Sequence, residues 1–147
     1  MRVWRDGEYD LAMDAAELSG LSLFAGLTPP ELEQVAGWSD ILEVETNERL
    51  IRNEEFGHEF FVILSGTAEA MDGDIHLADL VRGDFFGEIS LLDNDRRTAG
   101  VRATSPMRLM VINERDFRAM IAGMPSVAEQ VRRKVDERRE ASEFSKG

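Results

Sequence analysis

The residues of this chain best suited to chemistry lie in one stretch, from Arg82 to Ala99. It reads Arg-Gly-Asp-Phe-Phe-Gly-Glu-Ile-Ser-Leu-Leu-Asp-Asn-Asp-Arg-Arg-Thr-Ala. Gly87 stands directly before Glu88, and Arg97 follows nine positions after that glutamate. A glycine lets the backbone approach a ligand closely, and an arginine offers two parallel donors to phosphate oxygens. The stretch therefore has the residues of a phosphate-binding site.

The glutamate adds a second kind of recognition. If residues 88–92 form one helical turn, the free N–H groups at its start point toward an anion. The carboxylate of Glu88 suits a sugar hydroxyl better than a phosphate, so Glu88 and Arg97 facing one ligand suggest a ribose and a phosphate in the same molecule. The same residues also fit a plain hairpin loop in which Arg97 pairs with Asp93 or Asp95. The spacing alone leaves both interpretations open.

Composition excludes several other functions. The 147 residues include 17 Lys and Arg against 29 Asp and Glu, a net charge of −12, which argues against a nucleic-acid-binding surface. Cysteine is absent and the two histidines are His58 and His76, so neither a thiolate nucleophile nor a Cys- or His-rich metal site is available. We therefore expect no catalytic residues, no metal and no enzyme activity.

The chain also has no feature of a membrane or secreted protein. Its apolar runs are shorter than the roughly 18 residues of a membrane helix, and its charged start lacks the apolar core of a signal peptide. The length is that of one domain. We expect a single domain over residues 1–147, in the cytoplasm and with no membrane partner.

The N-terminal part is predicted to be helical. Residues 10–23 show a helical pattern of leucines and alanines. Thr28, Pro29 and Glu31 then form a capping-box sequence, which predicts a short helix over residues 31–38.

The middle of the chain changes to short apolar segments between Gly, Asp and Asn turns. Asp72-Gly73-Asp74 is a hairpin-type signal among them. Many short strands favour an antiparallel barrel, jelly roll or sandwich. The expected strands are residues 41–45, 50–52, 59–64, 67–71, 75–81, 99–104 and 107–112.

Helices return at the C-terminal end. Asn113 is a good N-cap for a helix that Gly123 ends, and Ser126 is the expected cap of a long last helix to about Ser142. The residues from Glu143 look like a loose tail. The expected chain is mainly β with flanking helices: a helical part over 10–38, a β part over 39–112 and C-terminal helices over 113–142.

Residues 83–99 resemble the phosphate-binding cassette of cyclic nucleotide-binding domains. The family pattern runs Phe-Gly-Glu-Leu-Ala-Leu, a variable loop, then Arg-Thr-Ala, and here the matching residues are 86–91 and 97–99. Residues 23–27 are similar to the Leu-Phe-x-x-Leu segment near the start of such domains, and residues 59–66 look like the family's third strand and its glycine turn. The resemblance therefore covers nearly the whole chain.

The resemblance implies an eight-stranded antiparallel β-roll of jelly-roll type, with N-terminal helices, a short cassette helix and a C-terminal lid helix. It implies that Glu88 accepts the ribose 2′-hydroxyl and that Arg97 pairs with the cyclic phosphate. The other ligand-binding residues it implies are Gly87, Ile89 and Ala99 through their N–H groups, Thr98 through its hydroxyl, and Ser90, which stands where the family commonly has Ala. Arg96 stands where Pro is frequent and is expected to face solvent.

The last helix is the least defined part of the predicted site. Val131, Arg132 and Val135 are candidate lid residues above the base. The spacing of the two valines equally describes a helix that packs on the roll.

The resemblance implies a function as well as a fold. We expect a standalone sensor that binds cAMP, with cGMP as the alternative and no cofactor, and whose lid shift is read by a protein effector; a homodimer is compatible with this. Two alternatives stay open: a ligand-independent interaction or dimerisation module, and an excised regulatory domain of a larger enzyme, channel or transcription factor. The intact Glu88 and Arg97 favour the sensor.

Overall fold

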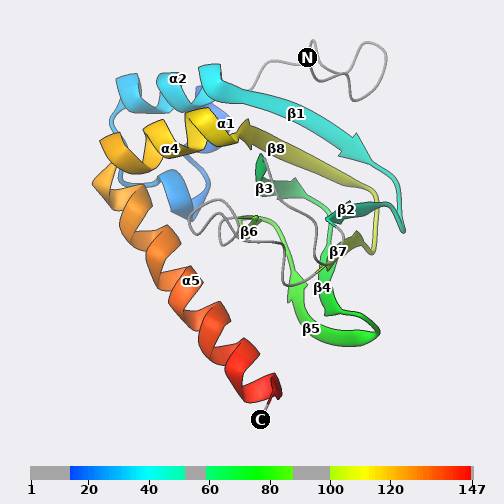
Figure 1. Cartoon of the computed structure of the whole chain (residues 1–147). Coiled ribbons are helices and arrows are strands. Elements are labelled where there is room, and N and C mark those ends of the chain that lie inside the picture. The colour runs from blue at the N-terminus through cyan, green and yellow to red at the C-terminus, as the bar shows by residue number, and fades with distance from the viewer. Residues whose placement is uncertain (1–13, 52–58, 88–99, 147) are drawn as a thin grey trace.

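The computed structural model describes residues 14–51, 59–87 and 100–146 (Figure 1). Helices lie at both ends of the described chain and strands lie between them. The helices are α1 (Ala15–Leu18), the 3-10 turn η2 (Ser22–Phe24), α2 (Pro29–Trp38), α4 (Glu114–Gly123) and α5 (Pro125–Lys146). The strands are β1 (Ser39–Val44), β2 (Arg49–Ile51), β3 (Glu59–Ser65), β4 (Ala68–Asp72), β5 (Ile75–Leu80), β6 (Phe85–Phe86), β7 (Gly100–Ala103) and β8 (Met107–Asn113).

The described strands form two four-stranded sheets. One sheet has the order β1-β8-β3-β6 and the other has the order β2-β7-β4-β5. Every strand pair within the described residues is antiparallel. The expected fold class, mainly antiparallel β with flanking helices, is confirmed.

The sheet that contains β3 and β8 is buried on both faces. In β3, Phe60, Val62 and Leu64 pack in a core cluster with the helices. The alternate residues Phe61 and Ile63 pack in a second cluster, between the two sheets. Side chains alternate between the faces of a strand, so this sheet is the middle layer of the molecule. Figure 1 shows the helices gathered on one side of it, with α5 running down beside β6.

Local sequence signals account for the helix starts. Thr28 and Glu31 form the expected capping box at the start of α2. Asn113 accepts a hydrogen bond from the Asp116 N–H at 2.9 Å, as an N-cap of α4. Both caps satisfy N–H groups that a helix start leaves unpaired.

Three expectations about the helices were wrong in part. In the described residues, the N-terminal helix covers only Ala15–Leu18, because the chain is extended at Leu21 before η2. Helix α5 starts at Pro125, one residue before the expected cap. Its backbone continues to Lys146, so the expected loose tail is helical there.

A charged cluster lies on the second sheet. Glu69 of β4 accepts a hydrogen bond from Arg102 of β7, and its other oxygen lies 3.2 Å from His76 Nδ1 of β5. The hydrogen bond from Arg102 is the main cause that lowers the pKa of Glu69 below its ordinary value of 4.5. The ionised carboxylate is therefore favoured in the folded chain.

This shift predicts a pH-dependent contribution to stability. A carboxyl whose pKa is lowered by folding stabilises the protein above its unfolded-state pKa, and this contribution is lost as the pH falls through the lower folded-state value. We expect Glu69→Gln to lower the free energy of unfolding at pH 7, and the difference from wild type to shrink as the pH falls below 4.5. Urea unfolding at a series of pH values checks this. Asp74→Asn, in the exposed β4–β5 turn, is the control, and a difference for Glu69→Gln that persists unchanged at low pH would contradict the prediction.

Candidate functional site

The structure describes residues 83–87 at the start of the predicted cassette and Gly100, which follows its last residue. Gly87 follows β6, at the edge of the first sheet, and Gly100 begins β7, in the interior of the second. The cassette therefore connects the two sheets. The other predicted cassette residues, Glu88, Ile89, Ser90, Arg97, Thr98 and Ala99, lie outside the described residues.

Gly87 has the backbone conformation that its residue type favours. Its φ is +97°, in the region that L-residues with a side chain rarely adopt. The chain thus leaves β6 through a turn that requires glycine, at the point where the sequence analysis expected a close approach to a ligand.

Aromatic packing fixes the strand that leads into the cassette. The ring of Phe86 stacks on Phe61 with centroids 4.9 Å apart and an interplanar angle of 14°. The ring of Phe85 points to the opposite face, where its centroid lies 5.5 Å from that of Phe60. Phe60 in turn lies 4.8 Å from Phe117 of α4. Both faces of β6 are therefore held by the core.

The turn before β6 is also held by hydrogen bonds. A carboxylate oxygen of Asp84 accepts from the Val81 N–H at 2.8 Å. The backbone of Gly83 and Asp84 exchanges two hydrogen bonds with Ile63 of β3, each of 2.9 Å. The Arg82 guanidinium donates to the Leu64 carbonyl at 2.8 Å. Residues 82–86 are thus held in a fixed position directly before Gly87.

The three candidate lid residues have different environments. Val131 and Val135 are buried in the cluster between the helices and the middle sheet, which matches the packing interpretation of their spacing. Arg132 is exposed. Their contact with a ligand stays a prediction.

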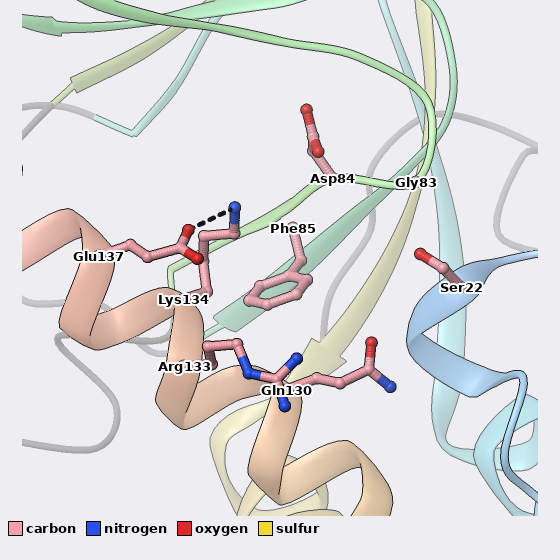
Figure 2. A pocket seen from close by; sticks show the side chains of 8 residues that line it. All are labelled: Ser22, Gly83, Asp84, Phe85, Gln130, Arg133, Lys134 and Glu137. Atoms are coloured by element: carbon pink, nitrogen blue, oxygen red, sulfur yellow. Dashed lines mark ion pairs between the residues drawn. The ribbon is translucent and has the colours of Figure 1, made fainter.

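A cavity of about 250 Å³ lies between α5, η2 and the start of β6 (Figure 2). Lys134 and Glu137 form an ion pair of 3.1 Å at its helix side. With two cationic and two anionic side chains in its wall, the cavity has no net charge that would select an anion. Its lining residues are Ser22, Gly83, Asp84, Phe85, Gln130, Arg133, Lys134 and Glu137.

Sequence reasoning missed the helix side of this cavity. Gln130, Arg133, Lys134 and Glu137 follow the spacing of one helical face, which is the available signal. This face is charged and mixed in sign, which is the usual pattern of a solvated helix surface. Only the position of the neighbouring strand β6 shows that this face lines a cavity and is not fully in solvent.

The described residues hold little else that could do chemistry. Among them, no group of three His, Asp or Glu side chains is arranged to hold a metal ion. His58 lies outside the described residues.

In the part of the chain that the structure describes, none of the helices combines the length and the apolar character needed to cross a membrane.

Comparison with known proteins gives a consistent result. Residues 41–123 match the family model of the cyclic nucleotide-binding domain, and this range contains the whole predicted cassette. The cAMP-dependent protein kinase regulatory subunit of Hypocrea atroviridis is 26% identical over 115 residues, 78% of this chain and 25% of that protein. A cyclic nucleotide-gated potassium channel of Rhizobium etli is 33% identical over 90 residues, 61% of this chain and 25% of that protein.

Solved structures share the fold. The regulatory domain of Toxoplasma gondii PKA, crystallised with cAMP, superposes with a TM-score of 0.76 at 22% identity, over 84% of this chain and 48% of that chain. The present chain spans about a quarter of the length of the curated kinase regulatory subunits that it matches. Since the family model covers more than half of the residues, the chain belongs to the cyclic nucleotide-binding domain family.

Proposed function

We propose that this chain is a regulatory module that binds cAMP through the cassette between β6 and β7. One observation carries the proposal: the residues for a ribose and a phosphate, Glu88 and Arg97, stand inside the segment that matches the family model. The names of the relatives favour cAMP over cGMP, since several are cAMP-dependent kinase subunits and two solved neighbours hold cAMP. No cofactor is needed for this function.

The proposed roles within the cassette follow its residue types. Glu88 accepts the ribose 2′-hydroxyl, and Arg97 donates to the cyclic phosphate. The supporting contacts come from the N–H groups of Gly87, Glu88, Ile89 and Ala99, from the Thr98 hydroxyl, and from Ser90. The positive φ of Gly87 supports this arrangement, because it turns the chain where the first of these N–H groups is required.

In this proposal α5 acts as the lid. It runs beside β6. Phe85 of β6 and four residues of α5 line the cavity between the helix and the strand. Val131 and Val135 hold the helix on the core, while Arg132, on the exposed side, is available to a partner.

We take the module to be a sensor without catalytic activity. Ligand binding would shift the population of lid arrangements by its differential affinity for them, and a protein effector in the cytoplasm would respond to that shift. A single domain over residues 1–147 and a homodimer are both compatible with this role.

The ribose contact gives the test of this proposal. Glu88→Ala is expected to weaken cAMP binding roughly tenfold, the lower end of the range for a charge-assisted hydrogen bond, and to change the binding of 2′-deoxy-cAMP little. Calorimetric titration of wild type and Glu88→Ala with cAMP and with 2′-deoxy-cAMP measures the coupling between the Glu88 carboxylate and the ribose 2′-hydroxyl. An equal loss for the two ligands would contradict the role of Glu88.

A further inference from the structure

Arg138 of α5 makes two contacts with one residue of β6. Its Nη2 donates a hydrogen bond to the Phe85 carbonyl at 2.6 Å. Its guanidinium also lies over the Phe85 ring, 5.6 Å from the centroid, within the range of a cation–π interaction. The side chain of Arg138 is partly buried, so both contacts are less screened by water than surface contacts would be.

The residue that Arg138 contacts is tied to the cassette and to the core. Phe85 stands two positions before Gly87, the first of the predicted ligand-binding residues. Its ring packs on Phe60, which packs on Phe117 of α4. A displacement of the Phe85 carbonyl would therefore be transmitted to Gly87 through two residues of backbone.

A second hydrogen bond holds α5 further back along the helix. The Gln130 side-chain amide donates to the Leu23 carbonyl of η2 at 3.0 Å. Gln130 and Arg138 are eight residues apart, about 12 Å along the helix axis. Besides its buried valines, α5 thus makes side-chain hydrogen bonds to η2 and to β6, and the one from Arg138 lies nearer to Gly87 in the chain.

The cavity lies beside these two hydrogen bonds. Figure 2 shows the Phe85 ring directed toward α5, among the side chains of Gln130, Arg133 and Lys134. Four side chains of α5 and the Phe85 ring line this cavity, so α5 and β6 are not closely packed against each other along it. The contacts of Arg138 with Phe85 are therefore direct links between α5 and β6 beside the cavity.

We propose that Arg138 is a positioning residue that couples the placement of α5 to the strand leading into the cassette. The part of the inference that concerns ligand affinity rests on the proposed function. If cAMP binds better when α5 lies against β6, breaking the contact must weaken cAMP binding, and by linkage bound cAMP must strengthen the contact.

The first experiment needs no ligand. Amide hydrogen exchange of the full chain is measured for wild type, Arg138→Ala, Arg138→Lys and the control Arg115→Ala, whose side chain on α4 is 93% exposed. We expect exchange in the peptides covering residues 130–138 and 85–87 to rise roughly tenfold in Arg138→Ala. Arg138→Lys, which keeps one donor but lacks the planar group, should fall between, and Arg115→Ala should match wild type. Wild-type exchange rates in Arg138→Ala would overturn the proposal.

The second experiment measures coupling to the ligand. We expect the cAMP dissociation rate constant to rise roughly tenfold in Arg138→Ala, with the association rate constant nearly unchanged and partial recovery in Arg138→Lys. Faster exchange with unchanged cAMP kinetics would overturn the coupling to the ligand. If wild type bound no cyclic nucleotide, the proposed function would fail, whereas the exchange experiment would still decide whether Arg138 positions α5.

Discussion

Replacing Arg97 with alanine is expected to weaken cAMP binding by roughly 10- to 150-fold, the largest loss of affinity from any single cassette residue. In the proposed site, the change removes a charge-assisted hydrogen bond to the cyclic phosphate, a contact worth roughly 1.5–3 kcal/mol. It also leaves a phosphate charge without its cationic partner. Titration calorimetry of wild type and variant, at one fixed salt concentration, gives the two dissociation constants.

The neighbouring arginine is a matched control. Arg96→Ala removes the same charge one position away, from a residue that is expected to face solvent. Its affinity for cAMP should stay within about twofold of wild type, because the interaction of an exposed charge is small. Equal losses for the two variants would mean that only the general charge matters, and wild-type affinity in Arg97→Ala would refute the assigned phosphate site.

Replacing Gly66 with alanine is expected to have the largest effect on stability. Gly66 joins β3 to β4 at a φ of +90°. A Cβ there would lie 2.3 Å from the Pro106 carbonyl oxygen and 2.9 Å from Met107 Cα. The left-handed backbone costs a residue with a side chain about 1–2 kcal/mol, and the overlap with a fixed backbone adds about 1–3 kcal/mol. We expect a loss of about 2–5 kcal/mol in the free energy of unfolding, measured by urea denaturation.

Gly73 separates the two causes of this loss. It also has a positive φ, +59°, in the β4–β5 turn, but a Cβ added there meets nothing within 4 Å. Gly73→Ala should therefore lose only the conformational part, about 1–2 kcal/mol. If the two variants lost the same stability, the close approach of the chain to Pro106 would not be the cause.

Elements with strong local signals were predictable from the sequence. The strand over residues 59–64 has a long apolar run ended by Ser65-Gly66, and β3 occupies nearly the same residues. The capping box at Thr28 and Glu31 needs only residues three positions apart, so it too could be read directly. At β3 and at the start of α2, residues close together in the sequence determine the secondary structure.

Strand β6 was not predicted because its cause is not local. Two residues are too few to show a periodicity. They form a strand because Phe85 and Phe86 pair with Val62 and Phe61 of β3. Such a partner is known only once the fold is known.

The helix side of the cavity and the Arg138 contact were missed for a similar reason. A guanidinium bonded to a backbone carbonyl 53 residues away has no sequence pattern. The spacing of Val131 and Val135, by contrast, fitted both a lid above the base and a helix that packs on the roll. Only the structure shows that both valines are buried. The sequence thus predicted a cassette over residues 83–99, but not how α5 is held beside β6.

The most direct test of the central claim is calorimetric titration of the purified chain with cAMP and cGMP, with 5′-AMP as the control. We expect micromolar or tighter binding of cAMP, weaker binding of cGMP, and much weaker binding of 5′-AMP, which lacks the cyclic phosphate. No heat with any of the three, from protein shown to be folded and free of co-purified nucleotide, would contradict the claim that this chain senses a cyclic nucleotide.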